Sequence, residues 1–300
     1  MLGDNYRDIT PQDYDLLNTY WNKSEDCPSD YTPFALIGWQ KDYNYKLDHD
    51  EKNGLIWLQG SELESHNLAP LGSAGRDNWE EILKERFGDE ASFELVPEKL
   101  FAKWQEVFGD RMSFEERRDY WEYLYDSESL ATLKGNKYMT QRNRTNRFKR
   151  LYEYEYVHIK KVPVSEVLAF QEKWCFDNYA DSGEGLLLEQ TAIEEILSNP
   201  EKYTNLTGGA IFIGGKMIAY TIGEIYGDML YVHFEKADTE YQASYQMINR
   251  EFVSDVLTRH PEVKLVNREE DLGDEGMRSA KMNYKPVDFI KKYFVKIDLK

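Results

Sequence analysis

Residues 208 to 238 read GGAIFIGGKMIAYTIGEIYGDMLYVHFEKAD and contain three runs of strand-forming residues. Two dipeptides, Gly214-Gly215 and Gly227-Asp228, separate these runs. Such dipeptides are typical of tight turns between antiparallel strands, because glycine adopts the backbone angles that the turns require. The segment therefore predicts an antiparallel meander of three strands.

Amphipathic segments lie on both sides of the meander. Residues 241 to 260 place Tyr245, Ile248, Phe252 and Val256 on one helical face. The remaining patterns predict helices at 165–176, 192–197 and 276–284, and strands at 263–266 and within 289–299. A meander followed by a helix, a strand and a further helix resembles the GNAT acyltransferase fold. That resemblance implies that the last meander strand separates from its neighbour, and that the next helix receives a pyrophosphate at its N-terminus.

The first half of the chain contains weaker copies of four of these segments, in the same order. The pairs are PQDYDLLNTYW (11–21) with PVSEVLAFQEKW (163–174), GLIWLQG (54–60) with GAIFIGG (209–215), EILKERF (81–87) with QMINREF (246–252), and FELV (93–96) with VKLV (263–266). Segments repeated in order indicate a duplicated domain. We therefore expect an α/β (α+β) protein of two tandem GNAT-like domains, residues 1–155 and 156–300. Each would have a mixed, mostly antiparallel sheet flanked by helices.

A basic segment stands out from an acidic chain. The formal net charge is -18, yet residues 130 to 151 contain no Asp or Glu. The seven cations of this basic segment are Lys134, Lys137, Arg142, Arg144, Arg147, Lys149 and Arg150. A local positive patch attracts a particular anion, while the net negative charge of the protein repels bulk nucleic acid. This argues against DNA and favours a phosphate-bearing partner.

The helix expected from Lys137 to Arg150 would have two distinct faces. Asn143, Arg147 and Arg150 share one face, where cations and amides could meet an anion. Arg144, Phe148 and Leu151 share the other, which could bury its apolar members. The predicted anion-binding residues are Lys134, Lys137, Arg142, Asn143, Asn146 and Arg147. The alternative is a solvated helix surface that is simply basic.

Three segments resemble one family in particular. They are YLYDSESLATLKGNKYMTQRNRTNRFKR (123–150), VHFEKAD (232–238) and VNREEDLGDEGMRSAKMNYKP (266–286). Together they resemble the phosphatidylglycerol lysyltransferase C-terminal domain family, here in a free-standing form. The resemblance implies tandem GNAT-like domains and relatives that transfer an amino acid from aminoacyl-tRNA to a lipid or a peptidoglycan peptide. It implies aminoacyl-tRNA or acyl-CoA as co-substrate, with no tightly bound cofactor.

The chain departs from the family and from acetyl-CoA enzymes at two points. No run approaches the roughly 20 apolar residues that span a bilayer, which makes phosphatidylglycerol a poor candidate substrate. The expected start of the central helix reads DTEYQASYQ (238–246) and has no glycine. Backbone amides there cannot approach a pyrophosphate as closely as in a glycine-rich loop. Ordinary use of acetyl-CoA is therefore disfavoured.

Polar residues on the last meander strand and after the short strand are the candidate catalytic groups. Strict alternation would place His233 and Glu235 on one face of the sheet, where either could take a proton from an attacking amine. The alternative is a buried polar pair that ties the sheet to a loop. Tyr284 lies where GNAT enzymes often place a general acid, although a tyrosine before Lys285-Pro286 also suits packing.

Asn267, Arg268 and Glu269 directly follow the predicted short strand at 263–266. Ligands bind at strand ends of open α/β sheets, so these residues could orient an amine. The alternative is a solvated loop in which Asp271 or Asp274 caps the next helix.

The remaining features bound the class of protein. The N-terminus has no signal-peptide pattern, and Cys27 and Cys175 lie far apart without a metal-binding motif. We therefore expect a cytoplasmic protein with reduced thiols and no metal site. Two functions stay open: an acyl or aminoacyl transferase acting on an amine, and a non-catalytic protein that binds a phosphate-bearing or peptide ligand between the domains. In a third possibility the first domain is purely structural. The oligomeric state does not follow from the sequence.

Overall fold

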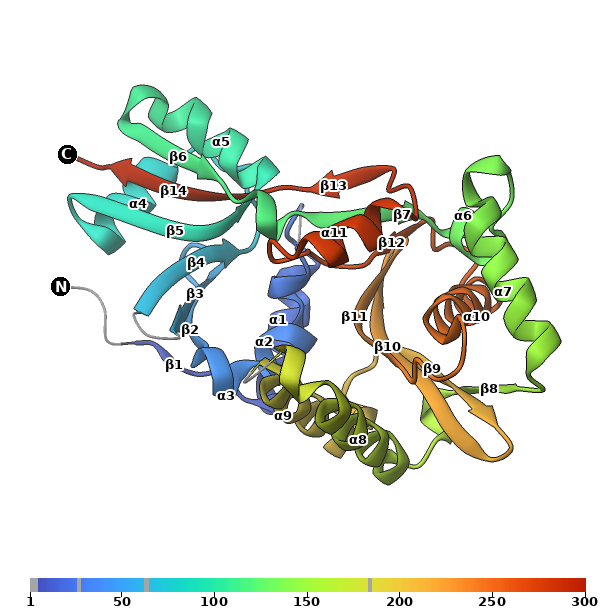
Figure 1. Cartoon of the computed structure of the whole chain (residues 1–300). Helices are drawn as coiled ribbons and strands as arrows, with labels where there is room; N and C mark the ends of the chain where they lie inside the picture. Colours follow the sequence, from blue (N-terminus) through green and yellow to red (C-terminus); the bar gives the residue numbers. More distant parts are fainter. Residues whose placement is uncertain (1–4, 26–27, 62–64, 183–184) are drawn as a thin grey trace. The chain divides into compact units, whose positions relative to one another are not determined.

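The computed structural model describes residues 5–25, 28–61, 65–182 and 185–300, which fall into two compact units (Figure 1). Unit 1 comprises Met1–Trp121 and Ile290–Lys300, and unit 2 comprises Glu122–Phe289. This division differs from the expected one at residue 155. Residues 122–155 belong to unit 2 and the last eleven residues to unit 1, because strands in these segments pair there.

Unit 1 has a seven-stranded sheet in the order β1-β2-β3-β4-β5-β14-β6. Its pairs are antiparallel except that between β4 and β5. Its strands are β1 (Arg7–Asp8), β2 (Lys46–Asp50), β3 (Leu55–Ser61), β4 (Ser65–Leu71), β5 (Glu90–Pro97), β6 (Met112–Glu116) and β14 (Lys292–Asp298). Its helices are α1 (Tyr14–Trp21), α2 (Pro33–Gly38), α3 (Gln40–Tyr43), α4 (Trp79–Phe87) and α5 (Glu98–Phe108).

Unit 2 has a second sheet, in the order β13-β7-β12-β11-β10-β9-β8. Its strands are β7 (Glu122–Asp126), β8 (Glu155–His158), β9 (Leu206–Ile213), β10 (Lys216–Tyr226), β11 (Met229–Ala237), β12 (Leu265–Asn267) and β13 (Asp288–Ile290). Its helices are α6 (Ser127–Thr132), α7 (Met139–Leu151), α8 (Val164–Ser182), α9 (Gly185–Ser198), α10 (Ser244–Arg259) and α11 (Glu275–Met282). The predicted meander is confirmed as β9, β10 and β11, with positive φ at Gly214, Gly215 and Gly227 in its two turns.

Both units have the predicted class of fold, and their elements follow the same order. A meander, a helix and a strand parallel to the last meander strand occur as β2-β3-β4-α4-β5 and again as β9-β10-β11-α10-β12. One of the four sequence matches pairs unlike strands. GLIWLQG forms β3, the middle strand, whereas GAIFIGG forms β9, the first strand. Buried strands of both kinds are apolar runs bounded by glycine, so the pattern does not distinguish their positions.

Each sheet contains one strand that is distant in sequence from a strand with which it pairs. In unit 1 the C-terminal β14 lies between β5 and β6 and pairs antiparallel with both. In unit 2, β7 lies between β12 and β13 and precedes the whole meander in sequence. The core of each unit is therefore completed by a strand that local sequence patterns cannot assign.

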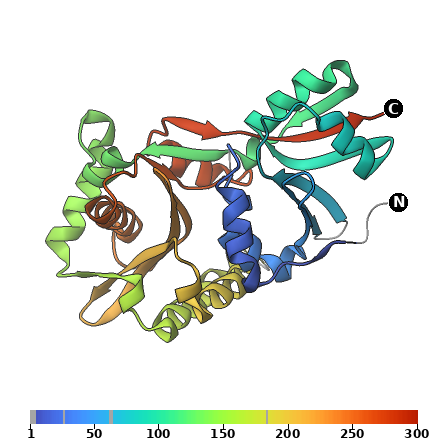
Figure 2. The same ribbon diagram turned by 180° about the vertical axis from the view of Figure 1, so that it is seen from behind.

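Helices cover both faces of the unit 2 sheet (Figures 1 and 2). On one face, Phe252 and Val253 of α10 pack against Leu230 and Val232 of β11, and all four are buried. On the other face, Phe170 of α8 contacts the Tyr220 ring of β10. Burying each such side chain contributes about 1.5–3 kcal/mol, so the paired strands β10 and β11 are held firmly between helices on both faces.

Candidate functional site

Strands β11 and β12 are parallel but pair at only three positions. These are Met229 with Leu265, Leu230 with Val266, and Tyr231 with Asn267. Beyond them β11 stays paired with β10 as far as Ala237, while β12 ends at Asn267. The strands therefore part after Tyr231, and the predicted separation of the last meander strand from its neighbour is confirmed. Charged side chains from both strands lie where they part.

A β-bulge at His233 interrupts the alternation of side chains along β11. Phe234 pairs with Ile222 and Val232 with Gly223, so His233 has no counterpart on β10. A bulge adds one residue and reverses the alternation beyond it. Glu235 consequently lies on the α10 face with Val232, and Asn249 of α10 donates a 3.1 Å hydrogen bond to it. The prediction that His233 and Glu235 share one face is wrong.

His233 bridges two carboxylates. Its Nε2 lies 3.1 Å from Glu224 Oε2 on β10, and its Nδ1 lies 2.7 Å from Glu269 Oε1. Burial alone would lower the pKa of the imidazole, but the two carboxylates outweigh it and raise the pKa to about 9. His233 is therefore a cation at neutral pH. Glu224 is fully buried, whereas the Glu269 side chain is 27% exposed.

Arg268 and Glu235 form a second charged pair beside the first. Arg268 Nη2 lies 2.8 Å from Glu235 Oε1, and the guanidinium stands 5.0 Å from the centre of the Tyr284 ring and 5.9 Å from that of Tyr125. Burial raises the pKa of Tyr284 to about 12. Tyr284 is buried, and its hydroxyl makes no hydrogen bond to another described residue.

The loop after β12 is built around buried polar groups. Asn267 is fully buried, donates to the Glu122 carboxylate and accepts a 2.8 Å bond from the Glu269 amide. Asp271 is also fully buried and accepts hydrogen bonds from Tyr123 (2.5 Å) and from Arg278 (2.6 and 2.9 Å). Asn267 thus supports the loop from within the protein.

The alternative for this loop was a solvated segment in which Asp271 or Asp274 caps the next helix, and only the capping by Asp274 is observed. This residue caps α11 by accepting a hydrogen bond from Met277. Glu122, Glu224, Asn249 and Lys281 belong to the same network and were missed from the sequence. A single acid within the apolar strand TIGEIY would have been the signal for Glu224.

The basic segment forms α7, close to the predicted bounds, but one of its predicted faces is wrong. Gln141, Thr145 and Phe148 are buried, and Phe148 packs with Met247 and Ile248 of α10. Leu151, expected to be buried with Phe148, is 52% exposed. The reason is that the helix turns the 141-145-148 stripe toward α10.

The predicted anion-binding residues have different surroundings. Arg142 is tied to the carbonyls of Leu133 (2.5 Å) and Gly135 (2.9 Å) and so supports the turn before α7. Lys134 lies 4.0 Å from Glu128, and Lys137 stands 5.0 Å from the Tyr138 ring centre. Asn143, Asn146 and Arg147 are exposed, and their side chains make no ion pair, hydrogen bond or ring contact within the described chain.

Comparison with known proteins assigns the family. Residues 24–296 match the model of the family described as phosphatidylglycerol lysyltransferase, C-terminal. The chain belongs to this family. A solved structure, that of a conserved protein of unknown function from Bacteroides thetaiotaomicron, is similar to this chain: it is 30% identical over 99% of this chain and 100% of its own, with a TM-score of 0.86.

More distant structures share the fold of this phosphatidylglycerol lysyltransferase C-terminal family. L-PGS from Bacillus licheniformis is 14% identical over 95% of this chain and 92% of its own, with a TM-score of 0.62. A tandem GNAT protein from the clavulanic acid biosynthesis pathway is 8% identical over 98% of both chains, with a TM-score of 0.50. These likenesses confirm the predicted tandem GNAT-like fold.

One curated relative matches over part of its length. An uncharacterized protein of Mycoplasmoides gallisepticum is 25% identical over 181 residues, so the match spans 58% of this chain and 56% of that protein. Within the described ranges, no helix of this family member has the length and apolar character needed to cross a bilayer. In the same ranges no group of three or more His, Cys, Asp or Glu side chains could hold a metal ion. Cys175 is a buried thiol whose Sγ accepts a hydrogen bond from Gln171 (3.3 Å), and Cys27 lies outside the described residues.

In this family member, backbone amides of the loop before α10 donate hydrogen bonds within the chain. The amides of Glu240 and Tyr241 both donate to Asp238, at 3.0 and 3.3 Å. The Gln242 amide donates to the Tyr152 hydroxyl (3.3 Å), and that of Ser244 to the Tyr241 carbonyl (3.1 Å). Amides engaged in this way are not available to a pyrophosphate, and the two acidic side chains of the loop oppose one.

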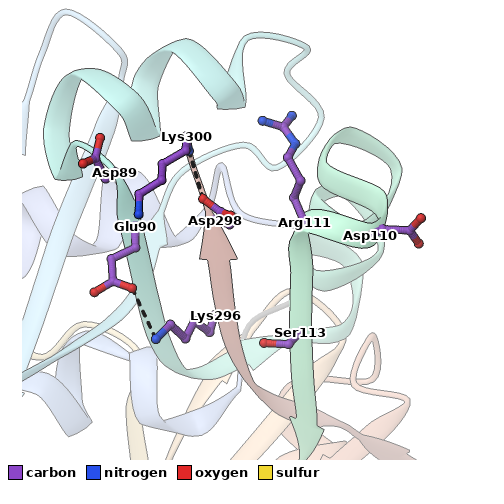
Figure 3. A pocket seen from close by; sticks show the side chains of 8 residues that line it. All are labelled: Asp89, Glu90, Asp110, Arg111, Ser113, Lys296, Asp298 and Lys300. Atoms are coloured by element: carbon purple, nitrogen blue, oxygen red, sulfur yellow. Dashed lines mark hydrogen bonds and ion pairs between the residues drawn. The ribbon is translucent and has the colours of Figure 1, made fainter.

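A hollow of about 590 Å³ lies in unit 1, on the charged face of the sheet (Figure 3). Lys296 forms a 3.2 Å ion pair with Glu90 in this hollow, and nearly all of the lining residues are exposed. It contains no buried polar group of the kind that unit 2 has where β11 and β12 part, so we place the candidate site in unit 2. The residues that line the hollow are Asp89, Glu90, Asp110, Arg111, Ser113, Lys296, Asp298 and Lys300.

Proposed function

We propose that unit 2 transfers an activated aminoacyl or acyl group to an amine at the place where β11 and β12 part. The observation that carries this proposal is the partly exposed Glu269 carboxylate, held at 2.7 Å from a buried imidazolium beside two separating parallel strands. In the reaction the amine nitrogen attacks the ester or thioester carbonyl, and a C–N bond forms. The C–O or C–S bond then breaks, and the leaving oxygen or sulfur gains a proton.

Glu269 is the general base of this proposal. Burial raises its pKa and the His233 cation lowers it, with a net rise above the ordinary value. A carboxylate with a raised pKa takes a proton from an amine more readily at neutral pH. His233 was a base candidate from the sequence, but an imidazolium has no free lone pair to accept a proton. We therefore assign it to holding Glu269.

The other candidate residues have supporting parts in the same reaction. Glu235, also a base candidate, is paired with Arg268, and the two hold each other in place. Arg268 and Glu269 orient the amine, and Asn267 supports their loop. Tyr284 is the proposed general acid, because its free hydroxyl lies beside Arg268 and can protonate the leaving group. Backbone donors on the edge of β11 would hold the oxyanion.

Aminoacyl-tRNA is the donor that these surroundings favour over acyl-CoA. The loop before α10 offers few free amides to a pyrophosphate. The outer face of α7 instead presents Asn143, Asn146 and Arg147 to solvent, and Arg144 is near enough to Tyr284 to lower its pKa. Lys134 and Lys137 extend the same surface. Phosphates of an RNA 3′ end could follow this surface toward the site, which implies a cytoplasmic protein.

The test is transfer of a labelled aminoacyl group. The chain is incubated with a mixture of labelled aminoacyl-tRNAs or with labelled acetyl-CoA, in the presence of a set of small amines and peptides. We expect label in the amine fraction from aminoacyl-tRNA, and a loss of at least about 100-fold in Glu269→Gln, as for removal of a general base. Glu275→Gln, which changes an exposed acid on α11, is the matched control.

The second candidate function is non-catalytic binding of a phosphate-bearing ligand, favoured by the exposed side chains of Asn143, Asn146 and Arg147 on α7. Thermal shifts with acetyl-CoA, aminoacyl-tRNA and free nucleotides distinguish the two. Stabilisation by aminoacyl-tRNA without transfer of label would support the binding protein and overturn the enzyme. Stabilisation by acetyl-CoA alone would overturn the choice of donor.

A further inference from the structure

Lys281 lies in α11 with its ammonium group against the backbone of the loop after β12. Its Nζ is 2.5 Å from the carbonyl oxygen of Arg268, 3.1 Å from that of Glu269 and 2.5 Å from that of Glu270. An ammonium group has three donors, and three consecutive carbonyls of the loop converge on them. Lys281 therefore acts on the backbone of the two residues that are central to the proposed site.

The convergence of these carbonyls requires an unusual backbone at Glu269. Its φ is 58°, in the left-handed region that non-glycine residues seldom adopt. The same conformation brings the Glu269 carboxylate to 2.7 Å from His233 Nδ1. Strain of this kind persists only where the surroundings over-determine the conformation. The three bonds to Lys281 are therefore suited to maintaining the reach of Glu269 toward His233.

Two other residues, Tyr123 and Asn267, also hold the loop. Tyr123 exchanges backbone hydrogen bonds with the loop, donating to the Glu269 carbonyl (3.2 Å) and accepting from the Arg268 amide (3.1 Å). Asn267 accepts from the Glu269 amide. Neither contact involves the carbonyls of Arg268 and Glu270, which Lys281 binds at 2.5 Å. Lys281 thus makes hydrogen bonds to the loop that Tyr123 and Asn267 do not make.

We infer that Lys281 is a positioning residue, which holds the Glu269 carboxylate against His233 by binding three consecutive carbonyls of the loop. The inference depends on the proposed function for its consequence in transfer, because Glu269 is the proposed base. The position of Glu269 can be measured without any assay of activity. His233 reports it directly, since its raised pKa depends on both Glu224 and Glu269.

The first experiment measures the pKa of His233 by NMR in the intact chain with labelled histidine. The chain has five histidines, and His233→Asn identifies the signal. We expect a pKa near 9 in the native chain and a decrease of about one to two pH units in Lys281→Gln and in Glu269→Gln. The double variant should match Glu269→Gln alone, because Lys281 acts through Glu269. Lys264→Gln, which changes an exposed lysine directly before β12, should leave the pKa of His233 unchanged.

An unchanged pKa in folded Lys281→Gln would overturn the inference, as would two decreases that simply add in the double variant. The native chain supplies a second measurement that needs no variant. Ammonium protons bound to three carbonyls exchange slowly with water, so Lys281 should give an observable ¹⁵N ammonium signal. Ammonium exchange as fast as that of Lys264 would also overturn the inference. Failure of the transfer assay with these NMR results intact would refute only the proposed function.

Discussion

His233 Nδ1 lies 2.7 Å from Glu269 Oε1, and this pair joins a β-bulge on β11 to the strained loop after β12. The bulge leaves His233 without a counterpart on β10, and the loop holds Glu269 at a positive φ. Both irregularities cost backbone free energy, and both are needed for the contact. The two elements on either side of the parted strands are therefore coupled by one charged hydrogen bond.

The stability of the chain should decrease as pH rises from about 6.5 to about 8. The folded-state pKa of His233 is about 9, above its ordinary value of 6.5, so the folded chain holds a proton that the unfolded chain loses in this interval. The His233 contribution is fully present below pH 6.5 and lost as pH rises through about 9. Between pH 6.5 and 8 the expected loss is about 2 kcal/mol.

Lys281 has the opposite effect at higher pH. Burial lowers its pKa from 10.5 to about 8, although nearby acids led by Glu270 oppose this. Above pH 8 the unfolded chain therefore holds more protons at this site, and the two contributions offset each other between about pH 8 and 9. Urea unfolding of the native chain and of His233→Gln at pH 6, 7 and 8 tests the prediction. Parallel pH dependence in the two proteins would contradict it.

Gly223→Ala should destabilise unit 2 and shift the bulge. A Cβ at Gly223 would stand 2.1 Å from the backbone oxygen of Tyr231, a contact that the side chains cannot relieve. We expect a loss of about 2–4 kcal/mol, as for other overpacked or strained buried sites, together with a lower pKa of His233. Urea unfolding and histidine NMR measure the two effects. Lys216→Ala, an exposed position on the same strand, should change neither by much.

Deletion of residues 290–300 should unfold unit 1. The deletion removes β14 from the middle of a sheet, together with the buried Val295 and Ile297. It also removes Lys292, a fully buried lysine that is ion-paired with Asp30. Loss of two apolar side chains and exposure of two strand edges costs at least about 4 kcal/mol, much of a domain's net stability. Hydrogen exchange measured by mass spectrometry should show rapid exchange in β2 to β6.

Deletion of Lys300 alone is the control for this experiment, since that residue is exposed. Slow exchange in β5 and β6 after the longer deletion would show that β14 is dispensable.

The double variant Asn143→Ala/Arg147→Ala should bind tRNA about tenfold more weakly, as expected for the loss of one or two phosphate contacts. Both side chains are exposed and make no contact that holds α7, so the free energy of unfolding should change little. Filter binding at several salt concentrations measures the affinity and its salt dependence. Lys264→Ala on the same unit should bind normally. Equal affinity of the double variant and the native chain would remove the phosphate surface from the proposal.

Much of the fold could be predicted because its patterns are local. The glycine dipeptides mark the turns of β9, β10 and β11, and the spacing of Phe252 and Val256 marks the buried face of α10. His233, Glu235, Arg268 and Glu269 were also found, since polar residues within or directly after buried strands stand out. Glu224 and Lys281 were missed because their roles depend on partners 9 to 13 positions away.

The sequence by itself determined the two GNAT-like units, the meander and the charged residues at its end. The spacing of apolar residues and the choice of turn residues depend only on neighbours along the chain. Only the tertiary structure decided which strand completes each sheet, since β7 and β14 form hydrogen bonds with strands that are distant from them in the sequence. It also decided that His233 and Glu235 lie on opposite faces, because a one-residue bulge changes the direction of every later side chain without leaving a mark in the sequence pattern. The charge of His233 follows from that geometry, as two carboxylates distant in sequence meet one buried imidazole.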